Sequence, residues 1–402
     1  MKILVINSGS STIKYQLFDG EVENVLVKGL VARLGEDGSY ISQQTPTVAY
    51  RQELPIQNHH EAFACMVEAL RHPVHGVLHD TNEVEAVGHR AVHGADAFVT
   101  SVLITPDVIA KLEACVPLAP LHNPPNLVGI REAQKLFPTV PHVAVFDTAF
   151  HQTMPPKAYL YAIPLEYHTQ HKIRKYGFHG TSCRYVALEA ARLLSRPLEE
   201  LKMVICHLGN GVTIAAVDGG KSIDTSIGFA TFSGVMMGTR TGDIDPGLAF
   251  YLHRELGMSL EQIERLYYRE SGLLGVSGVS NDMRVVVEQA QLHGHERCQL
   301  ALEMFTYRVR SYIGAYAAAM NGLDAVVFTA GIGENAPVVR RMACEGLGFL
   351  GLWLDDAAND QALGSQAIIS RPDSRVAALV VPTNEERMIA LDTLAIARAI
   401  MI

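Results

Sequence analysis

The chain has 402 residues, of which 48% are hydrophobic and 19% are charged, with a formal net charge of −9. This length exceeds one ordinary hydrophobic core, so we expect two domains. The acidic balance and the lack of a lysine- and arginine-rich run argue against a nucleic-acid partner, whereas a small anionic substrate needs only a few local cations.

Hydropathy and cysteine usage indicate a cytoplasmic protein with no membrane partner. No apolar run reaches the roughly 20 residues of a membrane-spanning helix, and no signal peptide precedes the first strand-like run. The cysteines form no CxxC pair, which favours reduced thiols over a disulfide framework or a zinc site. They are Cys65, Cys115, Cys183, Cys206, Cys298 and Cys344.

The first twenty residues predict a hairpin. Residues 2–6 and 13–18 form strand-like runs on either side of a turn, Asn-Ser-Gly-Ser-Ser-Thr, at 7–12, and Asp19-Gly20 closes the second run. Such a turn is either an ordinary hairpin or a seat for a phosphate against backbone N–H groups.

Strand and helix patterns then alternate through the first half of the chain. Residues 83–90 and 142–150 indicate strands that end in polar residues, residues 124–137 carry helical spacing after two prolines, and a helix follows Ser182. Residues 72–79 hold three histidines (His72, His75 and His79), but the proline and glycine between them favour a loop over a metal site.

The opening pattern returns two hundred residues later. Residues 202–220 read KMVICHLGNGVTIAAVDGG, so that Lys2 aligns with Lys202 and Gly9 with Gly209, and both segments end at Asp-Gly. This spacing predicts a duplication, two related α/β domains that face each other, although chance similarity between two hairpins is the alternative.

The last hundred residues continue the alternation. Residues 296–320 predict a long helix that Asn321-Gly322 stops, and residues 324–335 predict a strand, a glycine turn and a helix start. The tail is a predicted helix in which Thr383 and Glu386 fit a capping box. Strands that alternate with helices indicate an α/β fold with ligands at the carboxyl ends of the strands.

Three glycine turns follow apolar strands, at 7–12, 207–211 and 330–335. Glycine lets backbone N–H groups approach an anion, so together these turns favour nucleotide binding, whereas each alone fits a structural hairpin. No GxxxxGK[ST] phosphate loop is present. The nearest segment, AAVDGGKS at 215–222, lies in the second hairpin and reads as a surface turn. If ATP binds, we expect it between the paired hairpins.

Charged side chains lie at strand ends and in glycine-rich loops. Arg90 and Arg240 can each clamp a carboxylate or phosphate, or form a structural ion pair. Asp147 is either a functional carboxylate or a cap, and His179 either a functional or a packed histidine. If the last helix returns to the first domain, Asn7 and Glu385 come together as oxygen ligands suited to Mg²⁺.

Together these segments resemble the acetate/propionate/butyrate kinase family of the actin, hexokinase and Hsp70 superfamily. The matching stretches occur in order over nearly the whole chain: INSGSSTIKYQL, GHRAVHG, FDTAFHQTMP, KYGFHGTS, HLGNG, MGTRTGDIDPG, NDMR, GIGEN and PTNEE. The resemblance implies two related ribonuclease H-like domains with a cleft between them. Residues 1–149 with 384–402 would form the acyl and phosphate domain, and residues 150–383 the nucleotide-binding domain.

The resemblance also implies an activity: reversible transfer of the ATP γ-phosphoryl group to acetate, which gives acetyl phosphate and ADP in a cytoplasmic homodimer. The cofactor would be Mg²⁺, with Mn²⁺ as a substitute, held by Asn7 and Glu385. The carboxylate would attack directly and in line, because it is a nucleophile at neutral pH.

By the same resemblance, the other matching residues take the following roles. Asp147, His179 and Arg240 would be catalytic. Arg90 would bind the carboxylate, with Val92, Leu121 and Phe178 as apolar walls. The nucleotide would contact Lys14, His207, Leu208, Gly209, Asn210, Gly211, Asp282, Met283, Arg284, Gly331, Ile332, Gly333, Glu334 and Asn335. Asp282, implied on the ribose, could equally be a helix N-cap.

The chain departs from the family pattern at three places. Residues 230–234 read ATFSG where TPLEG is usual, so Thr231 replaces a pocket proline; Cys183 replaces a histidine; and Ala95 replaces a glycine after Arg90. Two alternatives accompany acetate phosphorylation. One is a kinase of the same fold for propionate or another acceptor, and the other is an ATPase switch that transfers no phosphoryl group.

Overall fold

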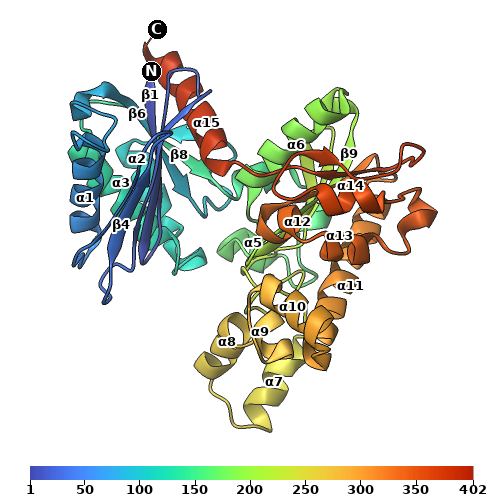
Figure 1. The fold of residues 1–402 in the computed structure, drawn as a ribbon. Coiled ribbons are helices and arrows are strands. Elements are labelled where there is room, and N and C mark those ends of the chain that lie inside the picture. Colours follow the sequence, from blue (N-terminus) through green and yellow to red (C-terminus); the bar gives the residue numbers. More distant parts are fainter. Residues whose placement is uncertain (402) are drawn as a thin grey trace. The chain divides into compact units, whose positions relative to one another are not determined.

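The computed structural model describes residues 1–401, which divide into two compact units. The first consists of Met1–Phe150 and the chain from Asn384 onward, and the second of His151–Thr383. Figure 1 shows the elements of each unit. None of the helices within residues 1–401 combines the length and apolar character that crossing a bilayer requires.

The first unit is built on an eight-stranded sheet with the order β5-β4-β3-β2-β1-β6-β8-β7. Strands β1, β6 and β8 are parallel, and the neighbouring pairs on either side are antiparallel. The strands are β1 (Lys2–Ser8), β2 (Thr12–Phe18), β3 (Val25–Ala32), β4 (Tyr40–Gln44), β5 (Ala49–Glu53), β6 (Val84–Ala91), β7 (Val102–Leu103) and β8 (His142–Phe146). The helices are α1 (His59–Arg71), η1 (Thr81–Glu83), α2 (Pro106–Ala114), η2 (Val116–Leu118), α3 (Asn123–Leu136) and α15 (Glu385–Met401).

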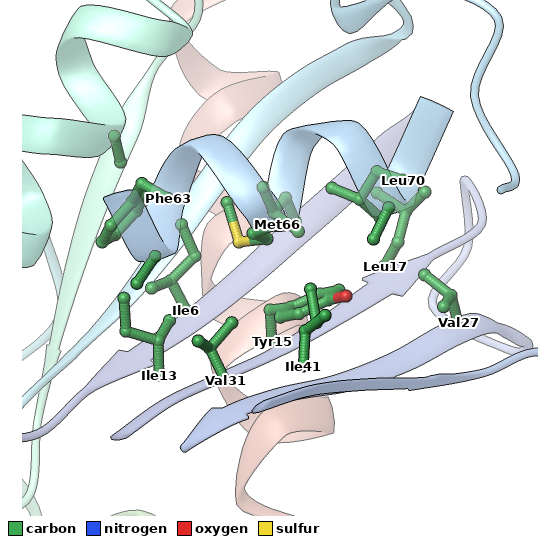
Figure 2. Close-up of a cluster of buried hydrophobic side chains, with 14 of the residues drawn as sticks. Ile6, Ile13, Tyr15, Leu17, Val27, Val31, Ile41, Phe63, Met66 and Leu70 are labelled. Atoms are coloured by element: carbon green, nitrogen blue, oxygen red, sulfur yellow. The ribbon is translucent and has the colours of Figure 1, made fainter. Parts of the chain in front are cut away.

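Helices cover both faces of this sheet. On one face, Phe63, Met66 and Leu70 of α1 pack onto side chains of β1 to β4, as Figure 2 shows. On the other face, Ile389 and Leu394 of α15 join a second cluster. Burying an aliphatic or aromatic side chain of this size contributes roughly 1.5–3 kcal/mol, so these two layers hold the strand ends in fixed positions.

The last helix lies unusually close to the sheet at Gly88 of β6. A Cβ atom there would lie 2.4 Å from Thr393 Oγ1 and 2.8 Å from Ile389 Cγ2, both on α15. Glycine at this position therefore lets α15, the helix that Glu385 opens, pack closely against the strand that carries Arg90.

The second unit repeats this topology. Its sheet has the order β11-β10-β9-β12-β14-β13, with β9, β12 and β14 parallel and the flanking pairs antiparallel, as in β3-β2-β1-β6-β8-β7. The expected pair of related ribonuclease H-like domains is confirmed. The strands are β9 (Lys202–Leu208), β10 (Val212–Asp218), β11 (Lys221–Thr225), β12 (Ala325–Thr329), β13 (Ala367–Ile368) and β14 (Ala377–Val380).

Helices of the second unit include the long α11, which matches the predicted run 296–320. They are η3 (Ala149–Thr153, whose first two residues fall in the first unit), α4 (Pro156–Tyr159), α5 (Glu166–His171), α6 (Gly180–Leu194), η4 (Leu198–Glu200), α7 (Gly247–Arg254), α8 (Leu260–Arg269), α9 (Gly272–Ser277), α10 (Met283–His293), α11 (Glu296–Ala319), α12 (Ala330–Asn335), α13 (Pro337–Cys344), η5 (Leu347–Leu350) and α14 (Asp356–Gln361).

Two local predictions are wrong. Asn384, not Thr383, caps α15: its Oδ1 accepts from the Arg387 N–H at 3.0 Å, while the Thr383 hydroxyl lies 2.7 Å from Ser182 Oγ. The predicted glycine turn at 330–335 is itself helix α12, because Ala330 adopts a left-handed conformation (φ 63°) that turns the chain directly from β12 into the helix.

Buried histidines give this fold a dependence on pH. Burial lowers the pKa of His93 in the first unit and of His151 in the second to about 4, from a usual 6.5. Burial, followed by neighbouring His142, also lowers the pKa of His89.

We expect the free energy of unfolding to fall as the pH drops from 6.5 toward 4. In this range the histidines of the unfolded chain bind protons, whereas the buried histidine rings of the folded chain stay neutral. Proton binding therefore favours the unfolded state as the pH falls. Urea denaturation at several pH values measures the slope. His93→Gln should flatten it and His293→Gln, at an exposed position, should not; equal slopes in all three proteins would contradict the prediction.

Candidate functional site

The first unit gathers its predicted site residues at one edge of the sheet. Asn7 lies near the end of β1, Arg90 near the end of β6 and Asp147 directly after β8, and these three strands are parallel neighbours. The carboxyl ends of parallel strands are where α/β proteins place ligands. The structure thus brings together residues that are up to 140 positions apart in the chain.

Arg90 and Asp147 form a bidentate ion pair. Arg90 Nε donates to Asp147 Oδ1 at 3.1 Å and Nη2 donates to Oδ2 at 2.6 Å, while Nη1 lies 3.4 Å from Asn7 Oδ1. Asp147 is 2% exposed. Burial acts to lower the pKa of Arg90, but the charges of Asp147 and Glu385 outweigh it, so the net pKa is raised and the side chain stays cationic.

Lys14 and Glu385 belong to the same edge. Lys14 is the cross-strand partner of Asn7 in the β1–β2 hairpin, so both side chains project from the same face of the sheet. Glu385 opens α15, and its charge interacts with those of Arg90, Asp147 and Lys14. The first glycine turn is closed by the Gly9 N–H, which donates to Thr12 O at 2.8 Å.

The donor set at this edge fits a hard divalent cation. Desolvation, then the negative charges of Asp147 and Glu386, raise the pKa of Glu385 to about 7, against the opposing influence of Arg90 and Lys14. A cation would relieve this crowding of carboxylates. The Asn7 and Glu385 side chains offer the oxygen ligands that Mg²⁺ prefers, and Mg²⁺ takes its remaining ligands from water and phosphate.

The predicted acyl residues of this unit differ in exposure. Val92 is buried at 6% exposure, whereas Leu121 is 59% exposed on the segment between η2 and α3. Ala95 adopts φ 51°, a left-handed conformation that favours glycine. The loop that follows Arg90 therefore carries a small backbone strain at Ala95.

In the second unit, His179, His207 and Arg240 surround the second glycine turn. A Cβ atom on Gly211 would lie 3.2 Å from His179 Cε1 and 4.0 Å from Arg240 Nη1. The rings of His179 and His207 stack with centroids 4.2 Å apart. His179 has φ 55° at the start of α6, and its Nδ1 lies 2.8 Å from Thr213 Oγ1.

Arg240 differs from Arg90 because it forms no ion pair within residues 1–401. Its Nη1 donates to the carbonyl of Thr231 at 2.9 Å, and burial lowers its pKa. Thr231 thus holds Arg240 through a main-chain atom. Phe178 is buried at 4% exposure, with its carbonyl 3.0 Å from His151 Nε2.

A pocket of about 990 Å³ lies in the second unit. Three segments predicted to contact the nucleotide form part of its walls. They are the turn after β9, the start of α10, and helix α12. The predicted residues that line it are Gly209, Asn210, Asp282, Met283, Arg284, Gly331, Ile332 and Asn335. Asp282 caps α10, since its Oδ1 accepts from the Arg284 N–H at 2.9 Å, so the N-cap alternative is confirmed and the contact with the ribose stays a prediction.

Other predicted nucleotide residues are not on the pocket wall. Leu208 is fully buried, Gly333 packs against the end of β12, and Glu334 Oε1 accepts from the Thr383 N–H at 3.1 Å. Sequence reasoning missed Asn281, Val287, Gln291, Ala336, Pro337, Val338, Arg341 and Asp360 as lining residues. Helical spacing from Met283 could have found Val287 and Gln291, whereas nothing local indicates Asp360.

Comparisons with known proteins show which family the chain resembles. The sequence profile of the Acetokinase family matches residues 2–391. Acetate kinase from Thermotoga maritima is 53% identical over 395 residues, which cover 98% of both chains. A crystal structure of Porphyromonas gingivalis acetate kinase is similar with a TM-score of 0.94 and 45% identity, over 98% of this chain and 99% of that one. A crystal structure of a propionate kinase from Francisella tularensis is similar with a TM-score of 0.91 and 41% identity, over 98% of this chain and 99% of that one.

We expect Gly238→Ala to weaken binding of an adenine nucleotide. The new Cβ would lie 2.0 Å from Oδ1 of Asn210, which lines the pocket, so that side chain must move. Losing one polar contact should raise the dissociation constant roughly tenfold, as measured by calorimetric titration with ADP.

The matched control is Gly314→Ala, at a helical position in α11 where a Cβ meets no atom within 4 Å. It should leave nucleotide affinity unchanged and stabilise the fold by about 1 kcal/mol. Equal affinities for both variants would remove Asn210 from the nucleotide site.

Proposed function

Because the chain belongs to the acetokinase family, we propose that it transfers the γ-phosphoryl group of ATP reversibly to acetate, forming acetyl phosphate and ADP. The observation that carries this proposal is the Arg90 guanidinium, fixed by Asp147 beside Asn7 at the strand ends. A cation held in this way recognises a small carboxylate, and a sugar kinase or an ATPase switch has no use for it.

Arg90 is prepared for a carboxylate by its partner. Of its five N–H groups, two are used on Asp147 and one points toward Asn7 at long distance. The remaining donors can bind acetate. We therefore assign Asp147 the role of orienting Arg90, because an acetate ion is already deprotonated at neutral pH and needs no general base.

Charge neutralisation should dominate the transfer step. The phosphoryl group carries negative charge on its equatorial oxygens as it passes from ADP to the acetate oxygen, with attacking and leaving oxygens in line. On this proposal Arg240, which has no acidic partner among residues 1–401, and His179 donate to these oxygens, while Lys14 faces the phosphates. Preorganised donors of this kind account for much of the rate in such reactions.

Mg²⁺ would be held by Asn7 and Glu385, with Mn²⁺ as a substitute, and when bound it neutralises phosphate charge. Arg90 of the first unit would bind the acyl carboxylate, while the transferred phosphoryl group would meet Lys14 of the first unit and His179 and Arg240 of the second. The proposal assigns the nucleotide to the 990 Å³ pocket of the second unit, whose volume suits a ligand of that size. We further propose that the protein is a cytoplasmic homodimer.

Propionate is the second candidate acceptor. The similarity to a propionate kinase favours some activity on it. A pocket distinguishes one methylene by only about 1–3 kcal/mol, so propionate should be a measurable substrate even if acetate is preferred.

The direct test is formation of acyl phosphate from Mg-ATP and acids of two to four carbons, trapped with hydroxylamine. We expect acetate to give the highest kcat/KM and propionate a lower but measurable value. Nucleotide binding without any trapped acyl phosphate would refute the proposed transfer and favour the ATPase switch.

Arg240→Ala should lower kcat on the order of 10³-fold, as expected when an arginine that neutralises phosphoryl charge is removed. The KM for acetate should change little, because Arg90 is intact. Arg254→Ala, an exposed position on α7, is the matched control and should leave kcat unchanged. If kcat survives in Arg240→Ala, Arg240 does not act in the transfer.

A further inference from the structure

Two buried asparagines at the start of α3 have no role in the proposed reaction. Asn123 is 1% exposed and Asn126 is 6% exposed, and they flank the double proline from which the helix was predicted. Buried amides are retained where both the carbonyl and the NH₂ group are hydrogen-bonded. The atoms that they bind therefore indicate what they do.

Asn126 connects two separate loops. Its Oδ1 accepts from the Val92 N–H at 3.0 Å, and its Nδ2 donates to the Ser8 carbonyl at 2.7 Å. Ser8 follows Asn7 in the first glycine turn, and Val92 follows Arg90 by two residues. One side chain thus links the turn assigned to the phosphates with the loop assigned to the acyl group.

The Asn123 side chain also makes two hydrogen bonds, but both are to the same residue, His93. Its Oδ1 accepts from the His93 N–H at 3.2 Å, and its Nδ2 donates to the His93 carbonyl at 2.9 Å. The two asparagines are one helical turn apart and similarly buried. They therefore form a natural pair for comparison, since only Asn126 contacts the first turn.

The helix is packed tightly against that turn. A Cβ atom on Gly129, three residues after Asn126, would lie 2.4 Å from Ser8 Cβ. The glycine lets the backbone of α3 approach Ser8, which is itself 3% exposed. The spacing between the helix and the turn is consequently set by contact as well as by the Asn126 hydrogen bonds.

We infer that Asn126 is a positioning residue for phosphate and acyl recognition. It fixes the separation between the Asn7 turn and the Arg90 loop, whose side chains lie 3.4 Å apart at Asn7 Oδ1 and Arg90 Nη1. The assignment of these loops to phosphate and carboxylate rests on the proposed function. The hydrogen bonds by which Asn126 links the two loops do not depend on the proposed function.

The test compares Asn126→Ala with Asn123→Ala. Each change removes two buried hydrogen bonds to main-chain atoms, so the two variants should lose similar amounts of thermal stability. Three further quantities are measured: amide hydrogen exchange, Mg-ATP affinity by calorimetry, and the KM values for ATP and acetate.

In Asn126→Ala we expect faster exchange at Val92 and across residues 7–12. The dissociation constant and the KM for Mg-ATP should rise about tenfold, the scale of one buried hydrogen bond left unmade. In Asn123→Ala the faster exchange should be confined to His93 and its neighbours, with Mg-ATP affinity within twofold of the parent. Identical profiles for the two variants would overturn the inference.

Asn126→Asp provides a second variant in case alanine prevents folding. It keeps an oxygen for the Val92 N–H but sets another against the Ser8 carbonyl, so Val92 should stay protected while residues 7–12 exchange faster and Mg-ATP binds more weakly. Unchanged exchange in residues 7–12 would also overturn the inference. Failure of the parent to form acyl phosphate would refute the proposed function alone, because exchange does not depend on turnover.

Discussion

Asp147 holds the guanidinium of Arg90 through two parallel hydrogen bonds at the carboxyl ends of β6 and β8. An arginine buried beside apolar strands is costly unless its charge and its N–H groups are satisfied. The bidentate carboxylate provides both, and it also fixes the plane of the fork. The orientation of Asn7 and the donors left for a substrate depend on this pair. Burial raises the pKa of Glu385, and the two charges of the pair act on it in opposite directions, Arg90 lowering it and Asp147 raising it.

The same strand arrangement occurs twice, and the two copies carry different chemistry. In each unit an antiparallel hairpin with a glycine turn lies beside two parallel strands. In the first copy the hairpin turn is accompanied by acidic and amide oxygens (Asn7, Asp147 and Glu385), which suit a metal ion. In the second it is accompanied by His179, His207 and Arg240, which suit phosphate oxygens. A duplicated scaffold thus carries a different set of polar side chains at the strand ends of each unit.

The sequence predicted the hairpins, their repetition, α3, α11 and the strand-end positions of Arg90 and Asp147, because these depend on local patterns of apolar residues, glycine and proline. The predictions from sequence were wrong where a residue that fits a local pattern instead bonds to a residue far away in the chain. Thr383 and Glu386 fit a capping box, yet the Thr383 hydroxyl pairs with Ser182 and Asn384 caps the helix instead. The Asn126 link and the lining residue Asp360 were not predictable either, because neither partner is near in the chain.

The two arginines show why pairing matters for the proposed transfer. Arg90 is neutralised by a nearly inaccessible carboxylate, so it can bind a second carboxylate only weakly, through its remaining donors, as a substrate that must leave requires. Arg240 is held by a carbonyl, which orients the fork without cancelling its charge. Partial burial lowers its pKa and makes an unpaired charge costly. A partly buried cation that is not neutralised by a carboxylate stabilises most strongly an anion whose charge grows as it reacts. The interaction is then stronger in the transition state than in the ground state.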